Sequence, residues 1–332
     1  MMKELQEILA ALDSSPSAGA ILATLVKVEG SSYRRPGARL LLTPDGRRIG
    51  SISGGCLEDD LVAQARKIQD SGQAITVTYD TTSENDLVWG VGLGCHGIVH
   101  VLIEELPPRP AWADVLRENF RQRVPTELAV VWGAPAGVRL GTGLAGNAPP
   151  EPSLRVFCQT VLPPTPLVIF GAGDDARPLA RFAKELGWHV SVVDPRPAFA
   201  TPARFPEADL TVVARPEEAA ARIPLGPDSV VAVMTHHYLH DVPLLRTLLP
   251  RPLAFLGLLG PRQRAERILS DLTAAGLAIT PEMRARLHAP VGLDLGADHP
   301  EEVALAILAE MQAVLSGRDG RPLRERNRPI HA

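Results

Sequence analysis

The sequence is poor in cysteine, in net charge and in long apolar runs. Only three cysteines occur, Cys56, Cys95 and Cys158, and none has the Cys-x-x-Cys spacing of a zinc or iron–sulfur site. An odd, sparse set of thiols indicates reduced cysteines in a cytoplasmic protein. The net charge of −4 gives no general attraction to nucleic acid. No apolar run reaches the ~18 residues of a membrane span, and the first helical stretch carries acidic residues, which a signal peptide lacks.

The 332 residues are enough for two domains, and the composition indicates where they meet. Prolines crowd the stretch "VLPPTPLVIFGAG", which predicts a stiff connector. Strands and helices mix irregularly before it, so we expect an α+β domain over residues 1–162. After it, short apolar β-branched runs alternate with helical segments, which predicts a Rossmann-like parallel sheet over 167–316. Residues 317–332 form a basic tail, either solvated or able to bind an anion or a partner.

The start of the second domain has the pattern of a nucleotide-binding turn. Gly171-x-Gly173-x-x-Ala176 follows a strand and opens a helix, and Asp194 ends the next strand. The glycines allow a tight turn, helix N–H groups face a phosphate, and the aspartate can bond a ribose hydroxyl. Asp174 and Asp175 stand where a diphosphate would approach, and their charge opposes binding. Three states therefore stay open here: bound NAD(P), a ligand with a single phosphate, or an idle site.

A glycine-framed cysteine is the main candidate for chemistry in the first domain. Gly54 and Gly55 let the backbone approach a ligand, and a helix over about 56–70 would present unpaired N–H groups near Cys56. That position stabilises the thiolate, although a cysteine on a helix is also often a small buried hydrophobe. Glu58, in the predicted first turn, either accepts a proton or favours the helix dipole. Cys95 lies in a second glycine-rich turn, so the two thiols could converge on one site, whereas Cys158 lies in an apolar strand and is expected in the core.

Polar residues also follow the later strands of the second domain. The stretch "VMTHHYLHDVPLL" places Thr235, His236 and Asp241 beyond the fourth predicted strand, at the edge where parallel sheets bind ligands. We expect His236 and Asp241 to form a hydrogen-bonded pair, with a surface role or a histidine metal site as alternatives. Gly257 and Gly260 follow in "FLGLLGPRQR". These glycines and the arginines after them form either a phosphate-binding site or only the end of a strand and the start of a helix.

Several motifs together resemble one family. "GSSYRRPGARLLL", "GSISGGCLEDDL" and "GLGCHGIVHVLIE" in the first half, and "GAGDDARPLARFAKELGWHVSVVDPR", "VMTHHYLHDVPLL", "FLGLLGPRQR" and "PVGLDLGADHPEEVALAILAEM" in the second, are similar to the XdhC/CoxI family of xanthine dehydrogenase accessory proteins. The similarity covers roughly residues 20–316 in the family's order. Two positions depart from the family pattern: His96 follows Cys95 where a glycine is usual, and Asp174 stands where histidine is frequent.

The resemblance implies a chaperone rather than a catalyst. Such proteins bind the molybdenum cofactor (molybdopterin), support its sulfuration and deliver it to a molybdenum hydroxylase. A cysteine desulfurase is then a second partner, and a homodimer is compatible with the resemblance. Under this interpretation Cys56 is a soft ligand to the molybdenum of the cofactor or a sulfur relay, with Cys95 second.

The residues that would hold the cofactor come from both domains, and two other functions stay open. Binding residues would be Gly54, Gly55, Arg35, Gly171, Gly173, Asp194, Thr235, His236, Asp241, Gly257 and Gly260. The first alternative function is an NAD(P)-dependent Rossmann oxidoreductase, which the glycine turn and Asp194 motivate. The second is a scaffold with an empty site.

Overall fold

The computed structural model describes residues 2–14, 19–80, 97–146 and 152–327. The chain divides into two compact units, Met1–Pro163 and Pro164–Ala332. We describe each unit by itself. Within the described ranges no helix is both long enough and apolar enough to cross a lipid bilayer.

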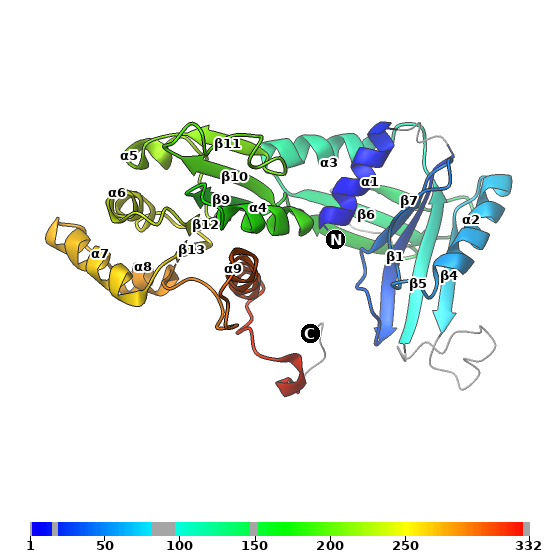
Figure 1. The fold of residues 1–332 in the computed structure, drawn as a ribbon. Helices are drawn as coiled ribbons and strands as arrows, with labels where there is room; N and C mark the ends of the chain where they lie inside the picture. Colours follow the sequence, from blue (N-terminus) through cyan, green and yellow to red (C-terminus); the bar gives the residue numbers. More distant parts are fainter. Residues whose placement is uncertain (1, 15–18, 81–96, 147–151, 328–332) are drawn as a thin grey trace. The chain divides into compact units, whose positions relative to one another are not determined.

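Unit 1 is built on a five-stranded antiparallel sheet in the order β3-β2-β1-β5-β4 (Figure 1). Its strands are β1 (Ile21–Gly30), β2 (Arg39–Leu42), β3 (Arg48–Gly50), β4 (Ile75–Asp80) and β5 (Gly97–Glu105). Helix α2 (Glu58–Ser71) covers one face through Leu61, Ala65 and Ile68. This is the mixed α+β unit that the sequence predicts.

The other face of this sheet packs on two helices and a smaller sheet. Helices α1 (Met2–Ser14) and α3 (Ala111–Gln122) share a core with strands of the antiparallel sheet β7-β6-β8. The strands of this sheet are β6 (Thr126–Gly133), β7 (Gly141–Leu144) and β8 (Arg155–Val161). Because successive residues of β1 point to opposite faces, Leu22 faces this core while Ile21 and Ala23 face α2.

Unit 2 is a parallel six-stranded sheet in the order β11-β10-β9-β12-β13-β14 (Figure 1). Its strands are β9 (Pro166–Phe170), β10 (His189–Asp194), β11 (Leu210–Val213), β12 (Val230–Val233), β13 (Phe255–Leu258) and β14 (Leu287–His288). Numbered from β9, this is the 3-2-1-4-5-6 order of the Rossmann fold, so the predicted fold class is confirmed. The direction of chain progress reverses between β9 and β12, where such sheets bind ligands.

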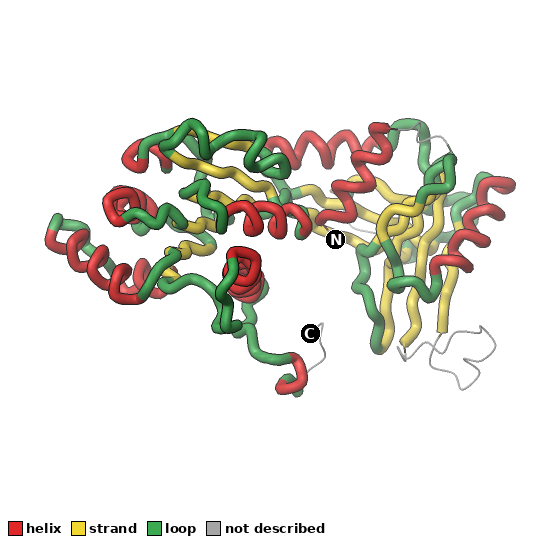
Figure 2. Tube along the Cα trace, in the orientation of Figure 1, coloured by secondary structure: helices red, strands yellow, loops and turns green. Residues whose placement is uncertain are grey.

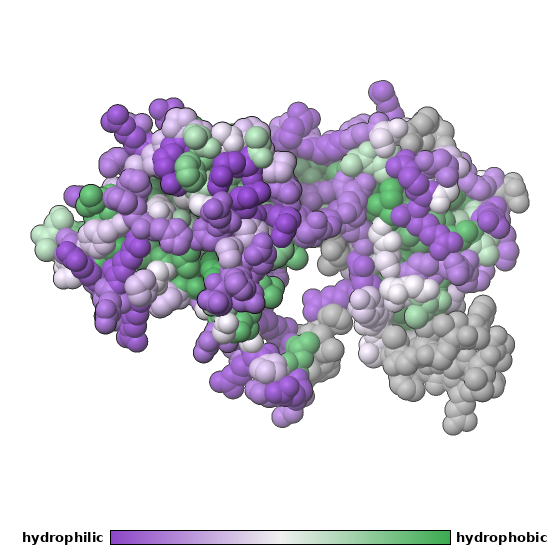
Figure 3. Space-filling model, in the orientation of Figure 1, coloured by the Kyte–Doolittle hydropathy of each residue, from purple (hydrophilic) through white to green (hydrophobic). Residues whose placement is uncertain are grey.

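Helices cover both faces of this sheet, as Figure 2 shows in red against the yellow strands. Helices α4 (Ala176–Glu185) and α9 (Pro300–Leu315) pack in the core on one face. Helices α5 (Pro216–Ala219), α6 (Tyr238–Leu248) and α7 (Arg262–Ala274) pack on the other. The short α8 (Pro281–Arg286) precedes β14, and residues 317–327 are mostly exposed with one 3-10 turn, Leu323–Glu325. The face drawn in Figure 3 is mostly hydrophilic, with apolar residues in small groups.

Cys158 corrects one expectation. The apolar stretch around it predicted a core position, but its side chain is exposed. Strand β8 pairs with β6 at an edge of its sheet, and Val161 is the one buried residue among its seven described residues. An apolar sequence therefore did not make this strand a buried one.

Candidate functional site

The loop that carries Cys56 is organised around the carboxylate of Glu58. Oε1 accepts hydrogen bonds from the backbone N–H groups of Ile52 (3.0 Å) and Ser53 (2.9 Å) and from the Ser51 hydroxyl (2.8 Å). Oε2 accepts from the Ser53 hydroxyl (2.5 Å) and from the N–H groups of Gly55 (2.9 Å) and Leu57 (3.1 Å). The loop is thereby wrapped around the carboxylate of Glu58, a residue that is only 8% exposed.

These hydrogen bonds decide the charge state of Glu58. Burial raises the pKa of Glu58, but the hydrogen bonds from Ser53, Ser51 and Ile52 lower it by more than burial raises it. The pKa of Glu58 therefore falls to about 2. The group is therefore a fixed anion at neutral pH, and all its acceptor positions are occupied by the chain itself.

Cys56 is exposed on this loop. Helix α2 begins at Glu58 with Leu57 as its N-cap, so Cys56 lies two residues before the helix rather than in its first turn. Gly54 and Gly55 have φ of +81° and +122°, a backbone conformation that glycine adopts more easily than any other residue.

A second loop meets this one. A Cβ atom at Gly54 would lie 2.9 Å from Cε1 of Tyr33, so the tyrosine ring lies directly against Gly54. Tyr33 is 64% exposed, and no pattern in the sequence points to its position beside this glycine. Arg34, next to it, donates to Glu4 Oε2 at 2.6 Å and is thus committed to α1. Arg35 is exposed, and its side chain makes no described contact in the ranges that the structure covers.

The third motif of unit 1, "GLGCHG", ends at Gly97, which lies at the same end of the five-stranded sheet. Gly97 opens β5 and pairs with Gly30 at the end of β1, and its Cβ position would lie 2.1 Å from the carbonyl oxygen of Ser31. Only glycine allows this approach. Cys95 and His96, which precede Gly97 in the sequence, lie outside the described residues. The "GSSYRR", "GGCLE" and "GLGCHG" motifs thus have described residues at one end of the five-stranded sheet.

In unit 2 the glycine turn lies across the switch point of the sheet. The Cβ position of Gly171 (φ +112°) would be 2.4 Å from the Met234 carbonyl oxygen, so the turn after β9 packs on the chain that leaves β12. The Cβ position of Gly173 would lie 2.7 Å from Oδ1 of Asp175 and 4.0 Å from Cδ2 of His236. The turn and the residues after β12 therefore lie side by side, at the position where Rossmann sheets have their ligand crevice.

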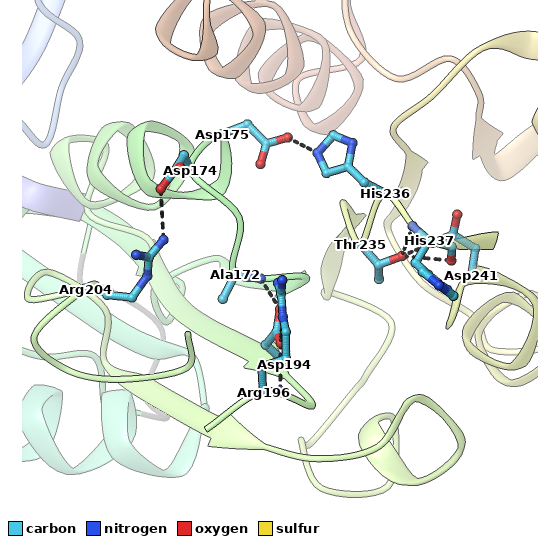
Figure 4. A network of polar contacts seen from close by, with 10 residues as sticks. All are labelled: Ala172, Asp174, Asp175, Asp194, Arg196, Arg204, Thr235, His236, His237 and Asp241. Carbon is cyan, nitrogen blue, oxygen red and sulfur yellow. Dashed lines mark hydrogen bonds and ion pairs between the residues drawn. The ribbon is translucent and has the colours of Figure 1, made fainter. Parts of the chain in front are cut away.

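Each acidic side chain near this turn has a partner of its own (Figure 4). Asp174 accepts a hydrogen bond from Arg204 Nη2 at 2.9 Å, and Asp175 Oδ2 lies 2.6 Å from His236 Nε2. Asp194 is bound by Arg196. The expected repulsion of a diphosphate by two free carboxylates is thus reduced, because the charges of Asp174 and Asp175 face cationic or hydrogen-bonding groups.

The expected pair of His236 and Asp241 is wrong. His236 pairs with Asp175, and Asp241 instead accepts from the Thr235 hydroxyl (2.5 Å) and from Arg264. The hydrogen bond to Asp175 raises the pKa of His236, whereas burial raises the pKa of Asp241 against the opposing effects of Thr235 and Arg264. His236 has φ of +56°, an uncommon backbone conformation for a non-glycine residue, which places its ring over the glycine turn.

The two glycines of the "FLGLLG" stretch differ from each other. Gly257 lies inside β13, where a Cβ would lie 2.6 Å from Val291 Cγ2, so its described role is packing. Gly260 (φ +132°) turns the chain beside Arg264. Over the described residues, no group of three or more His, Cys, Asp or Glu side chains is arranged to hold a metal ion.

The fold and the two groups of motifs define a two-unit α/β protein with a glycine-framed thiol loop and a Rossmann crevice. Comparison with known proteins agrees with this division into two units. A model of the XdhC and CoxI family matches residues 16–80, and a model of the XdhC Rossmann domain matches residues 167–311. The chain belongs to the XdhC and CoxI family.

Relatives match almost the whole chain. A Bacillus subtilis (strain 168) protein described as a probable subunit of xanthine dehydrogenase is 35% identical over 88% of this chain and 92% of its own length. The Escherichia coli (strain K12) protein described as the molybdenum cofactor insertion chaperone PaoD is 26% identical over 89% of this chain and 83% of its own. A crystal structure described as a xanthine dehydrogenase from Bacillus halodurans has a TM-score of 0.80 and 30% identity, and the match covers 98% of this chain and 99% of that one.

Proposed function

We propose that this protein is an accessory chaperone that binds the molybdenum cofactor, supports its sulfuration and delivers it to a molybdenum hydroxylase of the xanthine dehydrogenase type. Family membership and the description of PaoD as a molybdenum cofactor insertion chaperone support this role. The observation that carries the proposal is the exposed Cys56 on a loop whose shape is fixed by Glu58. In this role the protein is a carrier rather than a catalyst.

The proposed chemistry centres on Cys56. The thiol is exposed directly after Gly54 and Gly55. Six hydrogen bonds to Glu58 hold the loop, four from backbone N–H groups and two from serine hydroxyls. A thiolate is a soft ligand suited to the molybdenum centre of the cofactor, or a relay for the sulfur that the centre receives. In this arrangement Glu58 positions Cys56 and takes no proton, because its acceptor sites are filled. Cys95 is proposed as a second thiol for the same site, because Gly97, two residues further along the chain, lies at that end of the sheet.

The remaining groups would hold the organic part of the cofactor. Arg35 is exposed in the loop after β1 and offers a guanidinium to its anionic phosphate. In unit 2 we propose a second contact region formed by Gly171, Gly173, Thr235, His236 and Gly260. Asp194, Asp241 and Gly257 take part by supporting this crevice, since Asp194 and Asp241 are buried in ion pairs and Gly257 packs on Val291.

The partners follow from this role. The client is a molybdenum hydroxylase apo-enzyme, and a cysteine desulfurase supplies the sulfur. We place the protein in the cytoplasm, where its sparse thiols stay reduced, and propose that it works without nucleic acid or membrane. A homodimer is a further expectation.

An NAD(P)-dependent oxidoreductase is the alternative function. The Rossmann strand order and the glycine turn favour it. Against it, the carboxylate of Asp194 already binds the chain's own Arg196. Titration with NAD(H) and NADP(H) separates the two functions, since the chaperone needs neither nucleotide.

The experiment that tests the chaperone role is anaerobic purification after co-expression with the client, followed by molybdenum and pterin analysis. The wild-type protein is expected to retain molybdenum and pterin in equal amounts. Cys56→Ala is expected to keep its melting temperature but to retain at least about tenfold less cofactor, because the substitution removes only the sulfur from an exposed loop.

Cys158→Ala is the matched control, since it also removes one exposed thiol from unit 1. It should retain cofactor and activate the hydroxylase like the wild type. A wild-type protein free of molybdenum and pterin would point to an empty scaffold. Full cofactor retention by Cys56→Ala would remove the thiol from the mechanism.

A further inference from the structure

The end of β10 carries the residue that holds a ribose in dinucleotide-binding Rossmann domains. In this chain that residue, Asp194, is 2% exposed, and four N–H groups donate to its two oxygens. Oδ1 accepts from the backbone N–H and Nε of Arg196 at 2.9 and 2.8 Å. Oδ2 accepts from the Ala172 N–H and from Nη2 of Arg196, both at 2.8 Å. A carboxylate has about four acceptor positions, so none is left for a ligand.

The arginine is itself held in place. Its guanidinium carbon lies 3.6 Å from the ring centroid of Phe199, and that of Arg204 lies 4.8 Å from the same ring. Arg204 in turn donates to Asp174 in the glycine turn (Figure 4). Two ion pairs joined through one aromatic ring thus run from the turn after β9 to the end of β10.

We propose that Arg196 is the selectivity residue of this crevice: it occupies the ribose acceptor and so excludes ligands that bind through a ribose cis-diol, including the adenosine half of NAD. The inference concerns unit 2 and stands independently of the molybdenum cofactor. It also gives a different reason to expect weak NAD binding from the one that the sequence suggests. The acceptor is filled, whereas the repulsion by Asp174 and Asp175 is reduced by their own partners.

Replacing the guanidinium of Arg196 on the Asp194 carboxylate with the hydroxyls of a ribose is unfavourable. A diol would replace a bidentate, charge-assisted pair with two hydrogen bonds from neutral hydroxyls, and charge-assisted bonds are about twice as strong as neutral ones. The displaced guanidinium would also leave its stacking position on Phe199.

Removal of the guanidinium frees one acceptor position on each oxygen. In Arg196→Ala the backbone N–H groups of residues 172 and 196 still bind Asp194, but the bonds from Nε and Nη2 are gone. One free position on each of two carboxylate oxygens is the arrangement to which the two hydroxyls of a cis-diol can donate.

The test is calorimetric titration of the full chain with ADP-ribose, which contains the adenosine ribose and the diphosphate but no nicotinamide. The wild type is expected to bind weakly, and Arg196→Ala at least about tenfold more tightly, because a hydrogen bond to a charged acceptor contributes at least a tenfold factor. Arg181→Ala is the matched control, since it removes an arginine that stacks on Phe182 at 5.2 Å in the same unit and does not touch Asp194. It should bind like the wild type.

Three results would overturn the proposal: micromolar binding by the wild type, no gain in folded Arg196→Ala, or a gain that survives in the double variant Asp194→Asn/Arg196→Ala. Loss of the gain in the double variant supports the proposal, because the ligand then needs the freed carboxylate. If Arg196→Ala unfolds, Arg196→Gln, which keeps most of the side-chain volume but cannot form the bidentate pair, takes its place with the same criteria. None of these readouts involves molybdenum, so failure here leaves the chaperone role untouched.

Discussion

At the residue scale, the environment of an acidic side chain decides whether its carboxylate is available to a ligand. The sequence predicts that Asp194 binds a ligand and that Glu58 either accepts a proton or favours the helix dipole. Both carboxylates are instead saturated by hydrogen bonds from their own chain. Sequence gives the identity of an acid but not the number of N–H groups that fold around it. The residues that fill these sites, Ser53 and Arg196, lie within five positions of the acid, so a local signal is present in the sequence.

The carboxylate of Glu58 predicts a defined dependence of stability on pH. Its pKa in the folded protein, about 2, lies below the usual value of 4.5. The ionised form is therefore favoured by folding, and its contribution of about 3 kcal/mol is present above pH ~4.5 and is lost as pH falls from there through ~2. Glu58→Gln should lower the free energy of unfolding by about that amount at pH 7, and the difference from wild type should shrink towards pH 2.

Denaturant unfolding at several pH values measures this difference. Asp59→Asn is the control, because Asp59 is the second residue of the same helix but is exposed, and its described contact is a surface ion pair with Arg48 at 2.9 Å. A gap between wild type and Glu58→Gln that stays constant from pH 7 to pH 2 would contradict the burial and bonding of this carboxylate.

His236 should titrate above the usual range of a histidine, because its bond to Asp175 raises its pKa by favouring the charged ring. Asp175→Asn is expected to lower the pKa of His236, and Asp174→Asn to leave it nearly unchanged, since Asp174 pairs with Arg204. The imidazole proton resonances followed by NMR across pH 5–9 measure both. Equal shifts in the two variants would show that general charge, not the specific pair, sets the titration.

At the scale of the element, most strands and helices could be predicted from apolar patterns, and the failures have a common cause. Strand β7, Gly141–Leu144, has no alternating apolar pattern, and β14 has two residues, so neither gives a local signal. The exposure of Cys158 depends on what packs over the faces of β8, which other parts of the chain decide. The pairing of His236 with Asp175 likewise joins residues 61 positions apart. Motif positions follow from sequence, whereas side-chain partners follow from the assembled sheet.

A substitution at Gly97 tests whether the chain after β1 packs on the start of β5. Gly97→Ala would place a Cβ 2.1 Å from the Ser31 carbonyl oxygen and 2.9 Å from that of Glu29, and both are backbone atoms. The ends of β1 and β5 must then separate, and we expect a loss of about 2–3 kcal/mol in the free energy of unfolding.

Gly143→Ala in β7 is the comparison, because its Cβ position has no neighbour within 4 Å, and it should change stability by less than about 0.5 kcal/mol. Hydrogen exchange of residues 29–33 should accelerate only in Gly97→Ala. Equal stability of the two variants would mean that the loop after β1 does not pack on Gly97.

At the scale of the whole molecule, the described core residues fall into clusters that never mix the two units. Three clusters use residues of Met1–Pro163 only, and two use residues of Pro164–Ala332 only. Each unit has the size of an ordinary domain, and the boundary between them falls between Pro163 and Pro164. We therefore expect each unit to fold without the core of the other.

Separate expression of residues 1–163 and 164–332 should give two folded proteins, each with a cooperative thermal transition. The second fragment is expected to keep the raised pKa of His236, since Asp175 and the glycine turn lie in the same unit. The first should keep Cys56 open to alkylation under native conditions, as an exposed thiol on a loop held by residues of unit 1. Calorimetry, NMR titration and timed alkylation check these outcomes. A fragment that melts without a transition, or a Cys56 that reacts only after denaturation, would show that the loop and its core depend on contacts outside unit 1.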